Sequence, residues 1–412
     1  MIRKRASQFN RRLSMESLEE RRVLATYVAF GSIQDAVDLA ADNPGPDLVY
    51  VPAGRYTENV VINDGDPVAL YGVAAKINGN GQDAISIFDS ADVKIVGLTV
   101  YNGFDGINAD NVGRLNLQYV HAKDNTDDGI ELFQVAHAKL DYVQANNNGW
   151  GMYWNNVQNA SLFGVTAKHN DNDGLNVDTV ETLTVNSSVF DHNGDDGLFA
   201  ENIATAKLTA LITKHNGLDG VRVDSSDTVH IASSLSRDNG EDGFEVDARN
   251  TKATHLTAIH NGEDGLDVDD FSGDDSVQVL GGNYSYNGAD GLDLDDMENV
   301  EVSQVLATYN ELRGIHIDDS EHIDVSFSYA TANKGDGILI DSDQLVDDVR
   351  LWGVFSYLNK GNGLTASNID NLTVFGYFYL NEGNGIRTDN VAAFNRTLAF
   401  AWANGDKDIE EL

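Results

Sequence analysis

Apolar and polar residues alternate along most of this chain in short bursts that are separated by polar turns. One representative stretch shows the alternation at Leu115, Leu117, Val120, Ala122, Ile130 and Leu132. Period two is typical of β-strands, whereas a helix needs apolar residues three and four positions apart over about ten residues or more. The pattern therefore predicts three short strands in each repeat of the sequence.

Asparagine marks the repeat, because it recurs at intervals of 22 to 26 residues and is almost always followed four positions later by glycine. A fixed period in the low twenties predicts a solenoid in which each repeat forms one coil. Together with the strand pattern, it predicts an all-β, parallel β-helix of about fifteen coils. The column consists of Asn80, Asn102, Asn125, Asn147, Asn170, Asn193, Asn216, Asn239, Asn261, Asn287, Asn310, Asn333, Asn359, Asn381 and Asn404.

Each marker residue has an expected physical role. We expect the asparagines to point inward at a bend and to hydrogen-bond the asparagines of the coils above and below. The glycines are expected where the backbone has a positive φ or where two backbones approach closely.

A different pattern precedes the repeats and predicts a helix. Ser32-Ile33-Gln34-Asp35 is a variant of a capping box, with Asp in place of the usual Glu. The apolar residues that follow share one helical face, and the Asn43-Pro44-Gly45-Pro46 turn ends the helix. We expect this amphipathic helix to cover the open end of the solenoid core.

The Asn-x-x-x-Gly-apolar repeats and this entry segment together resemble the right-handed parallel β-helix, or pectin-lyase-like, superfamily over residues 27–412. The resemblance implies the fold and no single activity, because the superfamily includes lyases, hydrolases, epimerases and adhesins. The Asp-Pro-His motif of alginate epimerases and the Gly-His-Gly motif of polygalacturonases are both absent, so no catalytic residue is carried over. The chain is accordingly divided into a basic segment (1–25), the cap helix with the first coil (26–75) and the β-helix repeats (76–412).

The basic first segment contains Leu18-Glu19-Glu20-Arg21-Arg22-Val23-Leu24. This stretch resembles the Leu-Glu-Pro-Arg-x-Leu-Leu segments near the start of many large bacterial surface proteins, and departs from them at Glu20 and Val23. The resemblance and the absence of cysteine predict a protein secreted by a bacterium or held at its surface. The alternative is an ordinary basic tail.

The net charge of −39 limits the partners of the rod. Such a charge argues against nucleic acid and anionic membranes, and no apolar run is long enough for membrane insertion. It favours metal cations or a basic partner, or it simply keeps a long exposed rod soluble.

A coil repeat turns sequence positions into columns on the surface, with neighbours about 4.8 Å apart. Aspartates fill the column before Gly and the column four residues after it, and carboxylates stacked this closely repel unless a cation screens them. Oxygen-rich clusters without cysteine suit Ca²⁺, and the alternative is that these residues cap turns. The densest group, predicted as the metal site, is Asp267, Asp269, Asp270, Asp293, Asp295, Asp296, Asp318 and Asp319.

The column before Asn holds His169, His192, His215, Asp238 and His260 in five consecutive repeats, with Lys168, Asp191, Lys214 and Arg237 beside it. These groups could neutralise a uronate carboxylate while one of them removes the α-proton, which is the β-elimination chemistry of polysaccharide lyases. They could equally bind a transition metal or form a solvated turn. The candidate catalytic residues are His192, His215, Lys214 and Arg237.

Aromatic residues beside polar groups near one outward column are typical of sugar-binding faces, so we predict substrate contacts from Trp150, Tyr153, Trp154, Phe199 and Arg222.

Two functions remain open. One is a secreted or cell-surface protein that binds an acidic polysaccharide with Ca²⁺, with or without cleavage by β-elimination. The other is a non-catalytic adhesive rod whose acidic columns bind cations.

Overall fold

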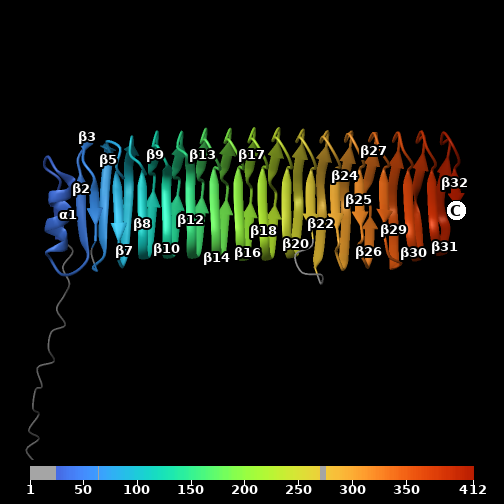
Figure 1. The fold of residues 1–412 in the computed structure, drawn as a ribbon, viewed down its shortest axis with the longest axis horizontal. Helices are drawn as coiled ribbons and strands as arrows, with labels where there is room; N and C mark the ends of the chain where they lie inside the picture. Colours follow the sequence, from blue (N-terminus) through green and yellow to red (C-terminus); the bar gives the residue numbers. More distant parts are fainter. Residues whose placement is uncertain (1–24, 64, 270–274) are drawn as a thin grey trace, which may run out of the picture.

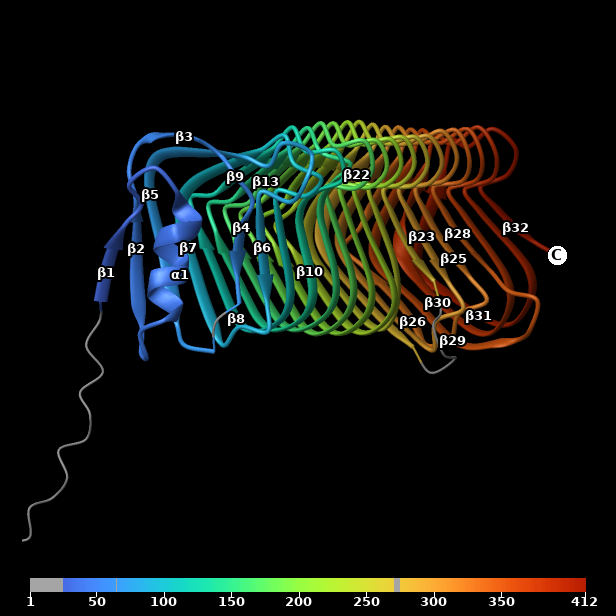
Figure 2. The ribbon, with the colours of Figure 1, turned by 60° about the vertical axis from the view of Figure 1, so that its left-hand side comes forward.

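The computed structural model describes residues 25–63, 65–269 and 275–412. These residues form an all-β solenoid of about 17 turns, which appears as a straight rod with the two ends of the chain at opposite ends (Figure 1). Seen obliquely, the coils nest one behind another with nearly constant outline (Figure 2). The fold prediction is confirmed, and the turns before Asn80 explain the number above fifteen.

One coil illustrates the others. Strand β14 (Leu175–Asn186) bends in its middle, so Leu175–Asp178 lie on face 1 of the rod and Thr182–Asn186 on face 2. Strand β15 (Val189–Asp191) forms face 3, and a turn that contains Asn193 leads to face 1 of the next coil. The neighbouring coils on either side pair with this coil in parallel and in register. Elsewhere the pairing is also parallel, and the register shifts in four pairs, β5–β7, β18–β20, β29–β30 and β30–β31.

Within the described ranges the one helix is α1 (Ile33–Ala41). The strands are, in chain order, β1 (Ala25–Val28), β2 (Asp47–Val51), β3 (Gly54–Thr57), β4 (Val60–Ile62), β5 (Val68–Asn78), β6 (Ile85–Phe88), β7 (Asp92–Tyr101), β8 (Ile107–Gln118), β9 (His121–Lys123), β10 (Asp128–Asp141), β11 (Gln144–Asn146), β12 (Trp150–Phe163), β13 (Thr166–Lys168), β14, β15, β16 (Leu198–Thr209), β17 (Ile212–Lys214), β18 (Val221–Ala232), β19 (Leu235–Arg237), β20 (Phe244–Ile259), β21 (Leu266–Asp269), β22 (Ser276–Ser285), β23 (Leu292–Asp295), β24 (Asn299–Thr308), β25 (Ile315–Asp318), β26 (Ile323–Ser326), β27 (Tyr329–Thr331), β28 (Ile338–Asp341), β29 (Val346–Tyr357), β30 (Leu364–Tyr379), β31 (Ile386–Trp402) and β32 (Ile409–Glu411).

A ladder of asparagines runs through the inside of the rod. In each link the side-chain Nδ2 and the backbone N–H of one Asn both donate to Oδ1 of the next; for Asn193 and Asn216 these distances are 3.0 and 3.1 Å. Most Nδ2 groups also donate to a carbonyl of the preceding coil, as Asn193 does to Ala167 at 3.4 Å. The inward position expected for the asparagines is therefore confirmed, and their polar groups find partners within the core.

The expected column is wrong at three of its members. Asn80, Asn102 and Asn147 are exposed and occupy the left-handed corner position, with φ between 52° and 57°. The ladder begins at Asn125, and in the next coil its member is Asn148, not Asn147. Asparagine tolerates positive φ better than most residues, so two adjacent positions both favour it.

The glycine column exists because of the ladder. A Cβ atom on Gly197 would lie 2.7 Å from Nδ2 of Asn216 and 2.5 Å from the carbonyl oxygen of Gly220 in the next coil. Its φ is not in the left-handed region. Of the two expected roles for glycine, close approach is the one observed.

The aspartates before glycine form a second ladder, parallel to the first. Oδ1 of Asp196 accepts the backbone N–H of Asp219 at 2.8 Å, and Oδ1 of Asp219 accepts that of Asp242 at 2.7 Å. The interpretation as turn-capping side chains is confirmed for this column. Asparagine replaces aspartate near the C-terminal end, where Oδ1 of Asn362 accepts the N–H of Asn384 at 2.7 Å.

Helix α1 begins at the N-cap Ser32, whose Oγ accepts the N–H of Asp35 at 3.1 Å. The rest of the expected capping box comes from elsewhere in the chain, because the carboxylate of Glu58 accepts the N–H of Ile33 at 2.9 Å and that of Gln34 at 3.1 Å. The helix buries its apolar face beside β1, β2 and β4 at the N-terminal end of the rod (Figure 1). Its capping function stays a prediction.

Replacing one ladder asparagine should destabilise the rod. In Asn216→Ala, the N–H of Asn193 loses its acceptor in the core, which costs about 1–3 kcal/mol. Urea unfolding measures the loss, and Asn250→Ala is the control because Asn250 is exposed on face 2. Equal midpoints for Asn216→Ala and the parent would contradict a stabilising ladder.

The aspartate ladder should make stability depend on pH. Burial raises the pKa of Asp196 from 3.8 to about 7, with a smaller contribution from the charge of Asp173. The pKa of Asp196 is higher in the folded than in the unfolded state. Its contribution to stability is therefore complete below pH 3.8 and is lost as the pH rises towards 7. This loss amounts to at most about 4 kcal/mol, since one pKa unit corresponds to roughly 1.4 kcal/mol.

Thermal melts at constant ionic strength should therefore show a melting temperature that falls between pH 5 and pH 8. Asp196→Asn keeps the Oδ1 acceptor and removes the titration, so its melting temperature should exceed that of the parent at pH 8 and fall less with pH. Parallel pH profiles for the two proteins would rule out Asp196 as a source of the dependence.

Candidate functional site

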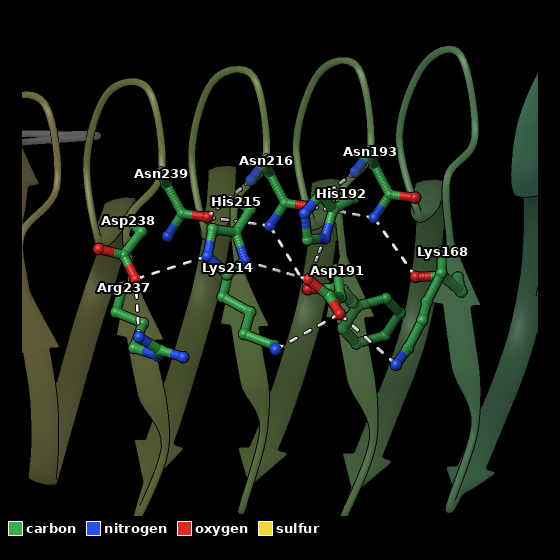
Figure 3. Close-up of polar contacts among 12 residues, drawn as sticks. Lys168, Asp191, His192, Asn193, Lys214, His215, Asn216, Arg237, Asp238 and Asn239 are labelled. Carbon is green, nitrogen blue, oxygen red and sulfur yellow. Dashed lines mark hydrogen bonds and ion pairs between the residues drawn. The ribbon is translucent and has the colours of Figure 1, made fainter.

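The candidate catalytic residues come together where face 3 meets the corner before the asparagine ladder (Figure 3). Lys168, Asp191 and Lys214 lie in register on β13, β15 and β17, and both lysine Nζ atoms are 3.5 Å from Oδ2 of Asp191. Asp191 is thus an aspartate between two lysines, and its side chain is the centre of the cluster.

The histidines occupy the left-handed corner, with φ of 54° at His169, 58° at His192 and 54° at His215. The His192 and His215 rings stack with centroids 4.5 Å apart, whereas the His169 and His192 rings are tilted by 41° with centroids 5.1 Å apart. Nδ1 of His192 lies 2.6 Å from Oδ1 of Asp191, and Nδ1 of His215 lies 3.3 Å from it.

The negative charge of Asp191 offsets the positive charges of this cluster. It is 6% exposed, and burial alone would raise its pKa, but the hydrogen bonds from His215 and His192 and the charge of Lys214 lower the pKa instead. A second carboxylate, Asp238, accepts a hydrogen bond of 2.8 Å from Arg237 and lies 3.7 Å from Nε2 of His215.

The structure therefore brings His192, His215, Lys214 and Arg237 together, as the sequence predicted, but with internal counter-ions. No role was predicted for Asp191 from the sequence. The signal was present, because Asp191 is the one acid in the column of Lys168, Lys214 and Arg237. An ion-paired cluster of this kind can hold a proton or a metal, and it offers an anion less attraction than its basic residues alone suggest.

The predicted sugar-binding residues separate into two groups. Trp150, Tyr153, Phe199 and Arg222 are half-buried on face 1, with the Trp150 and Tyr153 ring centroids 5.9 Å apart and the Arg222 guanidinium 5.9 Å from the Phe199 ring. Trp154 is 0% exposed, so its assignment to a binding surface is wrong. Strand alternation accounts for this, since Trp154 shares the inward phase of Met152.

A further group of aromatic side chains lies on face 3 of the last coils, where Trp402 is exposed and Tyr357 and Tyr379 are half-buried. Tyr357, Tyr379 and Trp402 stack with centroids 4.9 and 4.7 Å apart and interplanar angles of 6° and 5°. Stacking against a sugar needs a free ring face, and in this ladder neighbouring rings cover the faces. These residues are therefore poorly arranged to hold a saccharide.

The acidic group predicted as the metal site lies on face 1 and its corner, except Asp270, which is outside the described residues. Burial raises the pKa of Asp267 to about 9, with help from the charge of Asp269, and the pKa of Asp295 rises to about 6. Asp269, Asp293 and Asp295 thus form a crowded acidic surface.

An internal cation neutralises part of this group. Nδ1 of His316 lies 2.6 Å from Asp293, and Nε2 lies 3.2 Å from Asp341. Burial would lower the pKa of His316, but these hydrogen bonds raise it to about 9, so the ring is protonated at neutral pH. Asp319 is also engaged, because it accepts from Ser342 and from the N–H of Asp343.

Sequence reasoning missed face 2, where a surface cavity of about 400 Å³ lies over β8, β10, β12 and β14. Its walls include Arg114, Asn116, His137 and Lys139. The Asn and Gly that mark the repeat do not lie on this face. Only the register of the strands shows which of its side chains are neighbours in successive coils.

A family model described as "Right handed beta helix region" matches residues 150–283. No curated protein sequence matches the chain. Among the described residues, no helix is long and apolar enough to cross a membrane.

Solved structures with some similarity include the A-module of a mannuronan C-5 epimerase from Azotobacter vinelandii (17% identity, 92% of this chain and 94% of that chain, TM-score 0.34). A pectate lyase shares 14% identity over 68% of this chain and 78% of its own, with a TM-score of 0.37. A surface adhesin of Streptococcus pneumoniae shares 12% identity over 94% and 93%, with a TM-score of 0.25. At such low identities and TM-scores, these similarities indicate no activity for this chain. The family model over residues 150–283 and the parallel coils described above agree on the fold, which is a right-handed parallel β-helix.

Proposed function

We propose that this protein is secreted by a bacterium or held at its surface, and that it binds an acidic polysaccharide along face 2. One observation carries the proposal. Two adjacent outward columns on this face contain no carboxylate over seven consecutive coils, although the chain has a net charge of −39.

The two columns combine cations with neutral hydrogen-bonding groups. Arg114, Lys139, Lys207 and Lys252 supply the charge, and most of the remaining positions are asparagine, serine or threonine. In chain order the columns are Arg114, His137, Asn159, Thr182, Thr205, Thr228 and Asn250, and beside them Asn116, Lys139, Ser161, Thr184, Lys207, His230 and Lys252.

The spacing suits an extended polymer that lies along the rod. Lys139 and Lys207 are three coils apart and Lys207 and Lys252 are two, which gives roughly 14 and 10 Å at about 4.8 Å per coil. Repeating carboxylates of a polyuronate would meet these ammonium groups in turn, while amides and hydroxyls bond the sugar hydroxyls. The cavity of about 400 Å³ provides a recess for the chain within this face.

The histidine cluster is less suited to the first contact with an anion, because Asp191 and Asp238 pair with Lys168, Lys214 and Arg237. On face 2, Arg114 pairs with Asp92 and Lys139 with Asp141, at the edge of the two columns. Binding on face 2 requires no bond cleavage. β-Elimination by His192, His215, Lys214 and Arg237 remains a separate hypothesis, which the appearance of ultraviolet-absorbing unsaturated products from a polyuronate would test.

Ca²⁺ is the ion we propose for the acidic face 1. Its carboxylates offer only hard oxygen ligands, and their mutual repulsion falls when a divalent cation binds. This part of the proposal also serves the alternative function, an adhesive rod that binds cations. The two functions differ in their need for the lysines of face 2.

Lys139→Gln, Lys207→Gln and Lys252→Gln combined should weaken binding of a fluorescently labelled polyuronate. Three exposed charge pairs of about 0.5–1 kcal/mol each correspond to a roughly 10- to 100-fold higher Kd. Fluorescence anisotropy at increasing NaCl concentrations measures the Kd, and the parent should show the steeper salt dependence because it has more charges to screen.

Lys168→Gln combined with Lys214→Gln is the matched control, because these lysines pair with Asp191 at the histidine cluster. If the control loses affinity and the face 2 variant retains it, the polymer binds at the cluster. If neither the parent nor the variants bind any acidic polysaccharide, the proposal is wrong.

A further inference from the structure

We infer that two repeated Asp-Asp-Glu triads on face 1, Asp105–Asp128–Glu131 and Asp219–Asp242–Glu245, each bind one Ca²⁺ ion. They differ from the acidic group that the sequence pattern singled out. The inference rests on the Ca²⁺ part of the proposed function, for which it names the ligands, and it is independent of polysaccharide binding on face 2.

Both triads are built in the same way. Two aspartates occupy the column before Gly in consecutive coils, and the glutamate projects outward three residues after the second aspartate. In each triad, one ligand atom from every residue lies within 4.8 Å of the others. The glutamate reaches back across one coil, so its carboxyl group is within hydrogen-bonding reach of the first aspartate.

The second triad contains a buried carboxyl oxygen that could bind a cation. Asp219 is 0% exposed, and its Oδ1 accepts the N–H of Asp242. Its Oδ2 is buried and has no hydrogen-bond partner among the described residues, although the carboxyl group of Glu245 is adjacent. Two carboxyl oxygens in contact need a proton or a cation between them.

The first triad has a related feature on its other aspartate. Oδ1 of Asp128, the second aspartate of this triad, is buried without a partner in the described part of the chain, and Asp128 is 4% exposed. Nδ2 of Asn108 donates to Glu131 at 2.6 Å and to Asp105 at 3.3 Å, and so holds the two carboxyl groups together. The same arrangement thus occurs twice, five coils apart.

The chemistry of the triads selects the ion. Of the five clusters of potential ligands among the described residues, only these two consist entirely of carboxylates, since the other three include histidine. Ca²⁺ accepts six to eight oxygens in flexible geometry, and water can supply those that the triad lacks. Three carboxylates around one divalent cation also remove most of the local repulsion.

The two sites should differ in affinity. Nη1 of Arg222 lies 3.3 Å from Glu245 and competes with a cation there. No lysine or arginine is paired with a member of the first triad within the described ranges, so Asp105–Asp128–Glu131 should bind more tightly. Between the two triads, Asp173 and Asp196 also occupy the column before Gly in consecutive coils. Phe199 stands there in place of the glutamate, and these residues form no such cluster.

Isothermal titration calorimetry of the full chain with CaCl2 at pH 8 tests the inference. The parent should bind two Ca²⁺ ions, Glu131→Gln should lose the tighter site and Glu245→Gln the weaker one. Each change preserves side-chain volume, and unchanged circular dichroism in EDTA shows that a variant has folded. A proton shared between the carboxyl groups would satisfy the same oxygens, and then neither site would give a Ca²⁺ isotherm.

Asp269→Asn combined with Asp295→Asn is the matched control in the crowded acidic surface and should keep both sites. If this control loses Ca²⁺ and the glutamate variants do not, the ions bind there and the triads are not sites. Absence of Ca²⁺ binding to the parent also overturns the inference. The face 2 lysine variant should bind Ca²⁺ like the parent, so failure of polysaccharide binding and failure of the triads are separate results.

Discussion

The close approach of successive coils at the asparagine ladder is the constraint on which the rest of this structure depends. Each Asn side chain of the ladder bonds the Asn of a neighbouring coil, and this requires a residue without a side chain beside it, as Gly197 stands beside Asn216. The distance between coils that is fixed there also sets the distance between neighbouring residues within every other column. Side chains far apart in the sequence therefore meet as vertical neighbours, and every candidate site is built from such neighbours.

Stacking also decides how the rod carries its charge. Identical acids in one column repel, and the structure relieves this repulsion in different ways along its length. Backbone N–H groups stabilise the ladder at Asp196, a protonated imidazole lies between acids at His316, and lysines flank Asp191. At Asp128 and Asp219, one buried carboxyl oxygen has no hydrogen-bond partner among the described residues and remains available to a ligand. Cation-binding sites are therefore best sought where the repulsion between stacked acids is only partly relieved.

The fold could be predicted from the sequence because period, glycine and asparagine all follow from backbone geometry. The prediction failed at Asn147, where two adjacent positions favour the same residue for different reasons. It failed at Trp154 because the alternation of the strand was not followed through. The Asp-Asp-Glu triads and face 2 were missed because columns were considered singly, and both depend on side chains in adjacent columns and coils.

The two coils of 26 residues show where this architecture accepts change. In both, the longer connection joins face 1 to face 2, after Asp269 in one and between β28 and β29 in the other. The opposite corner, which carries the asparagine ladder, keeps its register through both coils. Duplication of a whole coil would lengthen the rod without disturbing the core, while new loops could evolve at a single edge. Such a protein can gain reach and specificity by separate genetic events.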